Sequence, residues 1–138
     1  MKTREELRIY IPDSKFFEPD PSALLALRAG EMQLIYSDLF AWTEDGNWPV
    51  APILVPILAK FDSLAVEHFL QVVSKDAEWL GMLMPEFLRE MSDSALNSLK
   101  PTLVRLAESP SEYEIMCGVD YAARLILNER LGFDYDLS

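Results

Sequence analysis

The sequence predicts an all-α fold, because apolar residues recur at helical spacing along almost the whole chain. Helix start and stop signals divide these stretches at intervals of about fifteen residues, and no convincing strand run is present beyond the short segment Leu7 to Ile11. Helices joined by connections of about one to five residues must run mostly antiparallel to their neighbours. Pairs of roughly thirty to forty residues match the unit of a stacked hairpin array. We therefore predict a short HEAT-like α-solenoid of about seven antiparallel helices.

Proline and glycine signals define the first three helices. Asp20 followed by Pro21 is typical of a helix start, and Gly30 is expected to end this helix in the left-handed conformation. A second helix is expected over about 31–42, and a third from Trp48-Pro49 to about residue 61. Because the third helix is apolar nearly all round, we expect it at the centre of the domain.

Four further helices follow, and each has a polar residue suited to cap its start. They are expected to begin at Asp62, at Asp76, at Ser92 or Ser94, and in the capping box Ser109-Pro110-Ser111-Glu112. The last is expected to run to about residue 131, where Gly132 stops it. In this scheme residues 1–19 form an N-terminal arm, residues 20–132 one helical-array domain, and residues 133–138 an acidic-aromatic tail.

The chain has 138 residues, half of them apolar, so one domain with a self-sufficient core is expected. The 12 lysines and arginines are outnumbered by 23 aspartates and glutamates, which gives a net charge of −11. Nucleic acid and anionic membranes both require a positive surface, so we expect neither as a partner. The charge suits a basic protein partner. The first eleven residues lack the apolar region of a secretory signal, so a cytoplasmic location is expected.

Residues that usually carry catalysis or bind metals are scarce. Cys117 and His68 are the single cysteine and the single histidine, and together they cannot supply an ordinary Cys/His zinc site. Nothing in the local sequence activates Cys117 as a thiolate. Phosphate-binding loops and nucleophile elbows are missing. We therefore predict a protein that is not an enzyme, with no catalytic residues, no metal and no cofactor.

Tryptophans beside an acidic turn form the first candidate binding site. Trp42 and Trp48 flank the turn that contains Glu44 and Asp45, and Trp79 follows in a later helix. Two interpretations are open. The indoles either fix the angle between two helices or form an exposed tip that contacts a partner beside the carboxylates.

An acidic stretch near the start of the last helix forms the second candidate. It contains Glu108, Glu112, Glu114 and Asp120 and no lysine or arginine. Carboxylates at a helix start stabilise the helix dipole, which alone explains Glu112 and Glu114. Concentrated negative charge on a rigid scaffold also steers a basic partner, so both interpretations are open.

The segment Asp45-Gly46-Asn47-Trp48-Pro49-Val50-Ala51 resembles a D-x-N-W-P-V-A signature that precedes an apolar helix in an uncharacterised bacterial family of small HEAT-like helical proteins. Supporting matches lie at residues 11–16 and 99–101, and the resemblance covers about residues 10–131. It implies a helical array and supplies no activity and no site residues. The resemblance departs at Leu80-Gly81-Met82, where the family tends to carry a basic residue and another aromatic.

Three function classes remain. The first is a non-enzymatic module that binds a basic protein, by analogy an acidic immunity-type protein that neutralises a basic toxin. The second is a small enzyme or ligand-binding domain that uses carboxylates in a cleft, for which one Asp or Glu would have a raised pKa. The third is a structural subunit that oligomerises through apolar faces.

Overall fold

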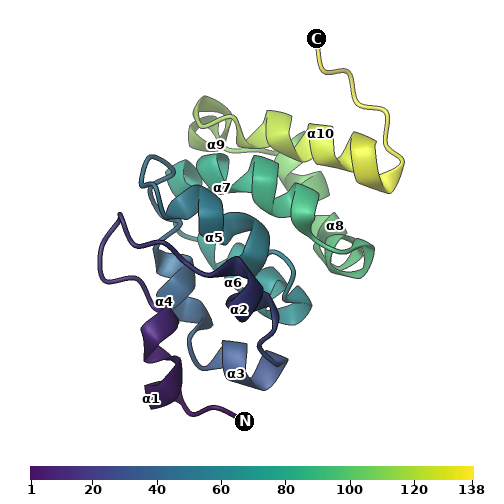
Figure 1. Ribbon diagram of the computed structural model, residues 1–138. Coiled ribbons are helices and arrows are strands. Elements are labelled where there is room, and N and C mark those ends of the chain that lie inside the picture. The colour runs from purple at the N-terminus through teal and green to yellow at the C-terminus, as the bar shows by residue number, and fades with distance from the viewer.

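A computed structural model describes residues 1–138 and confirms the all-α prediction, since it contains helices and no strand (Figure 1). The α-helices are α1 (Arg4–Leu7), α2 (Pro21–Leu25), α3 (Ala29–Gln33), α4 (Tyr36–Ala41), α5 (Ala51–Leu58), α6 (Asp62–Val73), α7 (Ala77–Glu90), α8 (Asp93–Glu108), α9 (Glu112–Met116) and α10 (Val119–Leu131). None of them combines the length and the apolar character that crossing a bilayer requires.

The N-terminal third is more helical than the sequence indicates. The segment that resembled a strand contains the end of α1 and a 3₁₀ turn over Arg8–Tyr10, and Thr3 caps α1 through a capping box with Glu6. Gly30 does not end a helix, because it lies inside α3 and has no positive φ. Glu31 stabilises the start of α3, because its carboxylate accepts the backbone N–H groups of Arg28 (2.9 Å) and Lys2 (2.8 Å). These two hydrogen bonds lower the pKa of Glu31.

Two expected helices are each divided in the structure. The helix expected over 31–42 breaks at Leu34–Ile35 into α3 and α4, and the helix expected from the Ser109–Glu112 box to about residue 131 breaks at Cys117–Gly118 into α9 and α10. The capping box itself lies two residues later than predicted, between Ser111 and Glu114. Gly118 adopts φ = 76°, a left-handed conformation that a continuous helix cannot contain. Gly132, with φ = 80°, ends α10 as the sequence predicts.

The core is one cluster of buried apolar side chains, and α5 lies near its centre as expected (Figure 1). On one side α5 packs against α2 and α4, and on the other against α7. The C-terminal helices stack in alternation, with α6 on α8, α7 on α10 and α8 on α10. The contact between α7 and the corner joining α9 to α10 is close: a Cβ atom added to Gly81 would lie 2.3 Å from the carbonyl oxygen of Cys117.

The C-terminal tail turns back onto the last helix. The Asn128 side chain accepts the backbone N–H of Tyr135 (2.8 Å) and donates to its carbonyl (2.9 Å), and the Phe133 and Tyr135 rings stack with their centroids 5.5 Å apart. The Tyr135 hydroxyl donates to Glu108 at 2.6 Å. Burial, together with the hydrogen bond to Glu108 and its charge, raises the pKa of Tyr135 to about 12. The tail is therefore joined to α8 and α10 by specific polar contacts.

Candidate functional site

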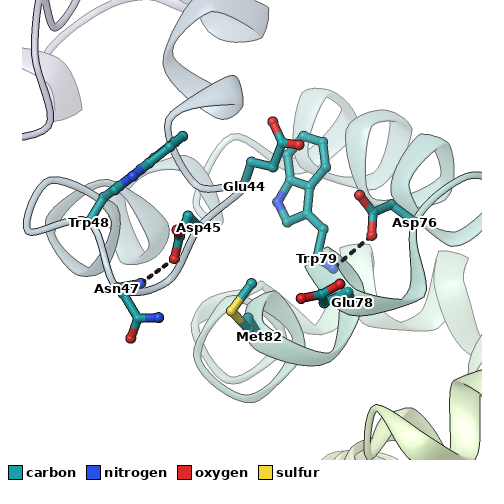
Figure 2. A pocket seen from close by; sticks show the side chains of 8 residues that line it. All are labelled: Glu44, Asp45, Asn47, Trp48, Asp76, Glu78, Trp79 and Met82. Carbon is teal, nitrogen blue, oxygen red and sulfur yellow. Dashed lines mark hydrogen bonds between the residues drawn. The ribbon is translucent and has the colours of Figure 1, made fainter.

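A surface pocket of about 400 Å³ lies between the turn that follows α4 and the first half of α7. Figure 2 shows the turn residues on one side of this pocket and the α7 residues on the other. The lining combines four carboxylates with two indoles, an amide and a thioether: Glu44, Asp45, Asp76, Glu78, Trp48, Trp79, Asn47 and Met82. We call this the acidic-aromatic pocket. It contains four of the nine residues that the sequence singled out, namely Glu44, Asp45, Trp48 and Trp79.

Local hydrogen bonds fix the two walls. On the turn, the Asp45 carboxylate accepts the backbone N–H of Asn47 at 2.9 Å, which closes an Asx turn. On the helix, Asp76 is the N-cap of α7 and accepts the backbone N–H of Trp79 at 3.0 Å. Both bonds are drawn in Figure 2. The positions of Asp45 and Asp76 therefore follow from ordinary turn and capping chemistry.

Trp79 holds the two walls together, and Trp42 and Trp48 pack on each other at the turn. The Trp79 indole is only 7% exposed and its Nε1–H donates to the Thr43 hydroxyl at 3.1 Å, while that hydroxyl donates to the carbonyl of Phe40 at 2.7 Å. These two hydrogen bonds in series join α7 to the end of α4. The rings of Trp42 and Trp48 meet edge to face across the turn, with centroids 5.5 Å apart, and both are partly exposed. The indoles thus combine a structural contact with accessible ring surface.

None of the four pocket carboxylates forms an ion pair within the chain, whereas six other Asp and Glu residues do. Lys75 forms a cation–π contact with a lining residue, since its ammonium lies 5.4 Å from the centroid of the Trp79 ring. The four carboxylates do not form a cluster suited to hold a metal ion. The pocket is therefore a region of uncompensated negative charge with an aromatic wall that already contacts one ammonium group.

The second candidate stretch has internal partners that its own sequence lacks. Glu114 is buried and receives two hydrogen bonds from the Arg105 guanidinium, at 2.6 and 3.1 Å. Burial opposes ionisation of Glu114, but the contacts with Arg105 and Ser111 outweigh it and lower its pKa. Asp120 lies 3.6 Å from Arg124, and Glu108 accepts from the tail. Glu112 is exposed and forms no side-chain hydrogen bond or ion pair with the rest of the chain. The other three carboxylates of the stretch are engaged within the protein, and Glu114 joins α8 to α9.

Tyr113, in α9, is within reach of the electrostatic field of the pocket carboxylates. The negative charge of Glu78 is the largest cause that raises the pKa of Tyr113, and Asp76 adds to it. The Tyr113 side chain is about half exposed. The field of the pocket therefore extends to the corner between α9 and α10.

His68 has a structural environment. Its Nδ1 lies 2.8 Å from the Leu64 carbonyl, so that nitrogen carries the proton and donates, and Nε2 accepts from the Ser37 hydroxyl at 2.9 Å. The ring is 7% exposed and packs against Tyr36 and Phe40, whose centroids lie 4.6 and 5.3 Å away. Both ring nitrogens are thus satisfied in the core. The carboxyls whose pKa values are shifted, Glu31, Glu114 and Asp136, are all shifted downward, opposite to what a general acid requires.

Sequence reasoning did not place Asp76, Glu78, Met82 and Asn47 in a site. The sequence predicts Asp76 only as a helix cap, which the structure confirms, and Glu78 is an exposed residue of the same helix. No periodic signal links them to a turn some thirty residues earlier, because that contact depends on how α5 and α7 pack.

The fold and the pocket define a small all-helical protein with an acidic-aromatic surface pocket. The chain belongs to the family described as Domain of unknown function (DUF5071), whose family model matches residues 10–127. No curated protein matches the chain. This match confirms the resemblance to an uncharacterised domain family. The matched range includes both walls of the pocket.

Proposed function

We propose that this protein is a non-enzymatic binding module whose acidic-aromatic pocket receives cationic side chains of a basic protein partner. One observation carries the proposal: four carboxylates converge on a pocket with two indoles and have no cation of their own. Like charges gathered without compensation cost stability, and a bound cation relieves that cost. A volume of about 400 Å³ is sufficient for one or two arginine or lysine side chains.

The chemistry of the lining favours an arginine or lysine over other ligands. Carboxylates pair with guanidinium and ammonium groups through charge-assisted hydrogen bonds. The partly exposed indole of Trp48 offers a ring face for cation–π contact, whereas the largely buried Trp79 ring already has the Lys75 ammonium over it. A net charge of −11 adds long-range steering toward a basic protein.

Several finer features belong to the same proposal. We interpret the alternating packing of α6, α7, α8 and α10 as a short HEAT-like array, a scaffold that holds binding surfaces rigid. A cytoplasmic location and a partner that is neither nucleic acid nor membrane fit the charge. A bacterial origin rests on the resemblance alone, and an immunity-type role against a basic toxin rests on charge and analogy, so both stay predictions. The carboxylate enzyme and the oligomerising subunit are the alternatives.

A capture experiment with charge-matched variants tests the proposal. The tagged protein is incubated with lysate of its own source cells, washed at low and at high salt, and the bound proteins are identified by mass spectrometry. The pocket variant is Glu44→Lys/Glu78→Lys, and the control is Glu112→Lys/Glu129→Lys, which changes net charge equally at exposed positions outside the pocket. We expect a basic protein that the wild type and the control retain at low salt and the pocket variant loses. Equal retention by both variants would show that the pocket is not the site.

A further inference from the structure

The acidic-aromatic pocket continues into a second, apolar hollow along α7. This hollow of about 260 Å³ lies between α7 and the start of α5 and is lined by Thr43, Gly46, Ala51, Pro52, Val55, Met82, Leu83 and Glu86. Met82 lines both cavities, and its sulfur lies 3.4 Å from the position that a Cβ atom on Gly46 would occupy. Figure 2 shows Met82 between the turn and Glu78. We call the two together the α7 groove.

The helical spacing of α7 gives the groove an order. Glu78, Met82 and Glu86 follow at intervals of four residues, so they share one face of the helix, and all three are exposed. Eight residues of α-helix span about 12 Å, which separates the two carboxylates. Glu86 forms no ion pair in the chain, like the carboxylates of the pocket. The groove therefore presents negative charge, then an apolar floor, then negative charge.

Building on the proposed function, we propose that the α7 groove binds an extended segment of the basic partner with two cationic side chains separated by three residues, the middle one apolar. Charge complementarity identifies this occupant, because carboxylates without an ion-pair partner stand at both ends of the groove, on either side of its apolar middle. In an extended chain, side chains on one face recur at every second residue, and four residues span about 13 Å. This spacing matches the separation of Glu78 and Glu86.

The middle of the groove is suited to side chains of varying shape. Met82 is 43% exposed and has three rotatable bonds, so its thioether can move aside and still cover an apolar guest. Pro52 and Val55 form the facing wall. The apolar residue of the partner segment thus adds affinity that charge alone does not supply, and that part is insensitive to salt.

Two synthetic peptides test the inference with the full chain. The first is a pentapeptide with arginine at both ends, leucine in the centre and serine between; the second has serine in place of leucine. Binding is followed by the indole NMR signals of Trp48 and Trp79, which line the pocket. We expect the leucine peptide to bind about tenfold more tightly, as burial of one aliphatic side chain predicts. In the variant Met82→Gln, the advantage of the leucine peptide falls to about threefold or less. Met82 is exposed, and circular dichroism can verify that the variant folds.

A second pair of measurements tests the register. Each arginine of the leucine peptide is replaced by serine in turn, and the replacement that weakens binding less identifies the arginine that faces Glu86. We expect this replacement to weaken binding about threefold in the wild type and to have no effect in Glu86→Gln. Equal affinity of the leucine and serine peptides, or a leucine advantage unchanged in Met82→Gln, overturns this inference and leaves the proposed function standing. If neither peptide shifts the indole signals, even at low salt, the proposed function fails as well.

Discussion

Replacement of Gly81 by alanine tests the close contact that fixes α7 against the corner between α9 and α10. The added Cβ atom would lie 2.3 Å from the Cys117 carbonyl oxygen and 3.3 Å from both the carbonyl carbon and the Cys117 Cβ. Carbon and carbonyl oxygen normally meet at about 3.3 Å or more, so the two elements must separate by roughly 1 Å. The obstacle is backbone, which cannot rotate away as a flexible side chain can.

The expected magnitude is a balance of two terms. In a helix interior, alanine is favoured over glycine by about 1 kcal/mol. Forcing a methyl group into a filled contact costs about 1 to 3 kcal/mol, and a backbone obstacle places this case at the upper end. We therefore expect Gly81→Ala to destabilise the protein by about 2 kcal/mol, which lowers the melting temperature by roughly 8 °C in a chain of this size.

Urea unfolding, monitored by far-ultraviolet circular dichroism and tryptophan fluorescence, measures this difference. Gly30→Ala is the matched control, because Gly30 also lies in a helix and a Cβ there would meet only the Met1 side chain, at 3.3 and 3.5 Å. The control is expected to be neutral or stabilised by up to about 1 kcal/mol. If Gly81→Ala gains stability as the control does, helix propensity decides and the close approach of α7 to Cys117 is not present in solution.

Three other predictions follow from the charges of the molecule. Because the pKa of Glu114 is lowered in the folded state, its contribution to stability is present at neutral pH and is lost as the pH falls below the ordinary glutamate value of 4.5. Glu114→Gln should therefore cost about 1 kcal/mol of unfolding free energy at neutral pH, and the variant should lose less stability than the wild type on acidification. An unchanged slope of the urea midpoint against pH would contradict this. Lys75→Gln removes a positive charge at the pocket edge that repels the arginines of the peptide, so it should tighten binding of the leucine peptide about threefold. Weaker binding would instead make Lys75 part of the site. Glu78→Gln should lower the pKa of Tyr113 toward the usual tyrosine range, as tyrosinate absorbance would measure, and an unaffected titration would separate Tyr113 from the pocket.

The amino-acid sequence by itself determined the helical class, the central place of α5 and most helix starts. Asp20, Asp76 and Ser92 cap helices as predicted, because capping depends on a side chain and a backbone N–H three residues later. The stop at Gly132 is equally local. The breaks between α3 and α4 and between α9 and α10 were not predicted, because apolar periodicity continues across each of them, and the chain bends there to pack on other elements.

Only the tertiary structure decided which charges are free. Glu114 stands in a stretch without basic residues, yet Arg105 reaches it from the neighbouring helix α8. Glu44 and Glu78 look no different in the sequence, but packing of α5 against α7 brings them together without a cation. Ion pairing acts over a few ångströms in space and is indifferent to distance along the chain, so sequence alone counts the carboxylates and the fold determines which of them remain available to a partner.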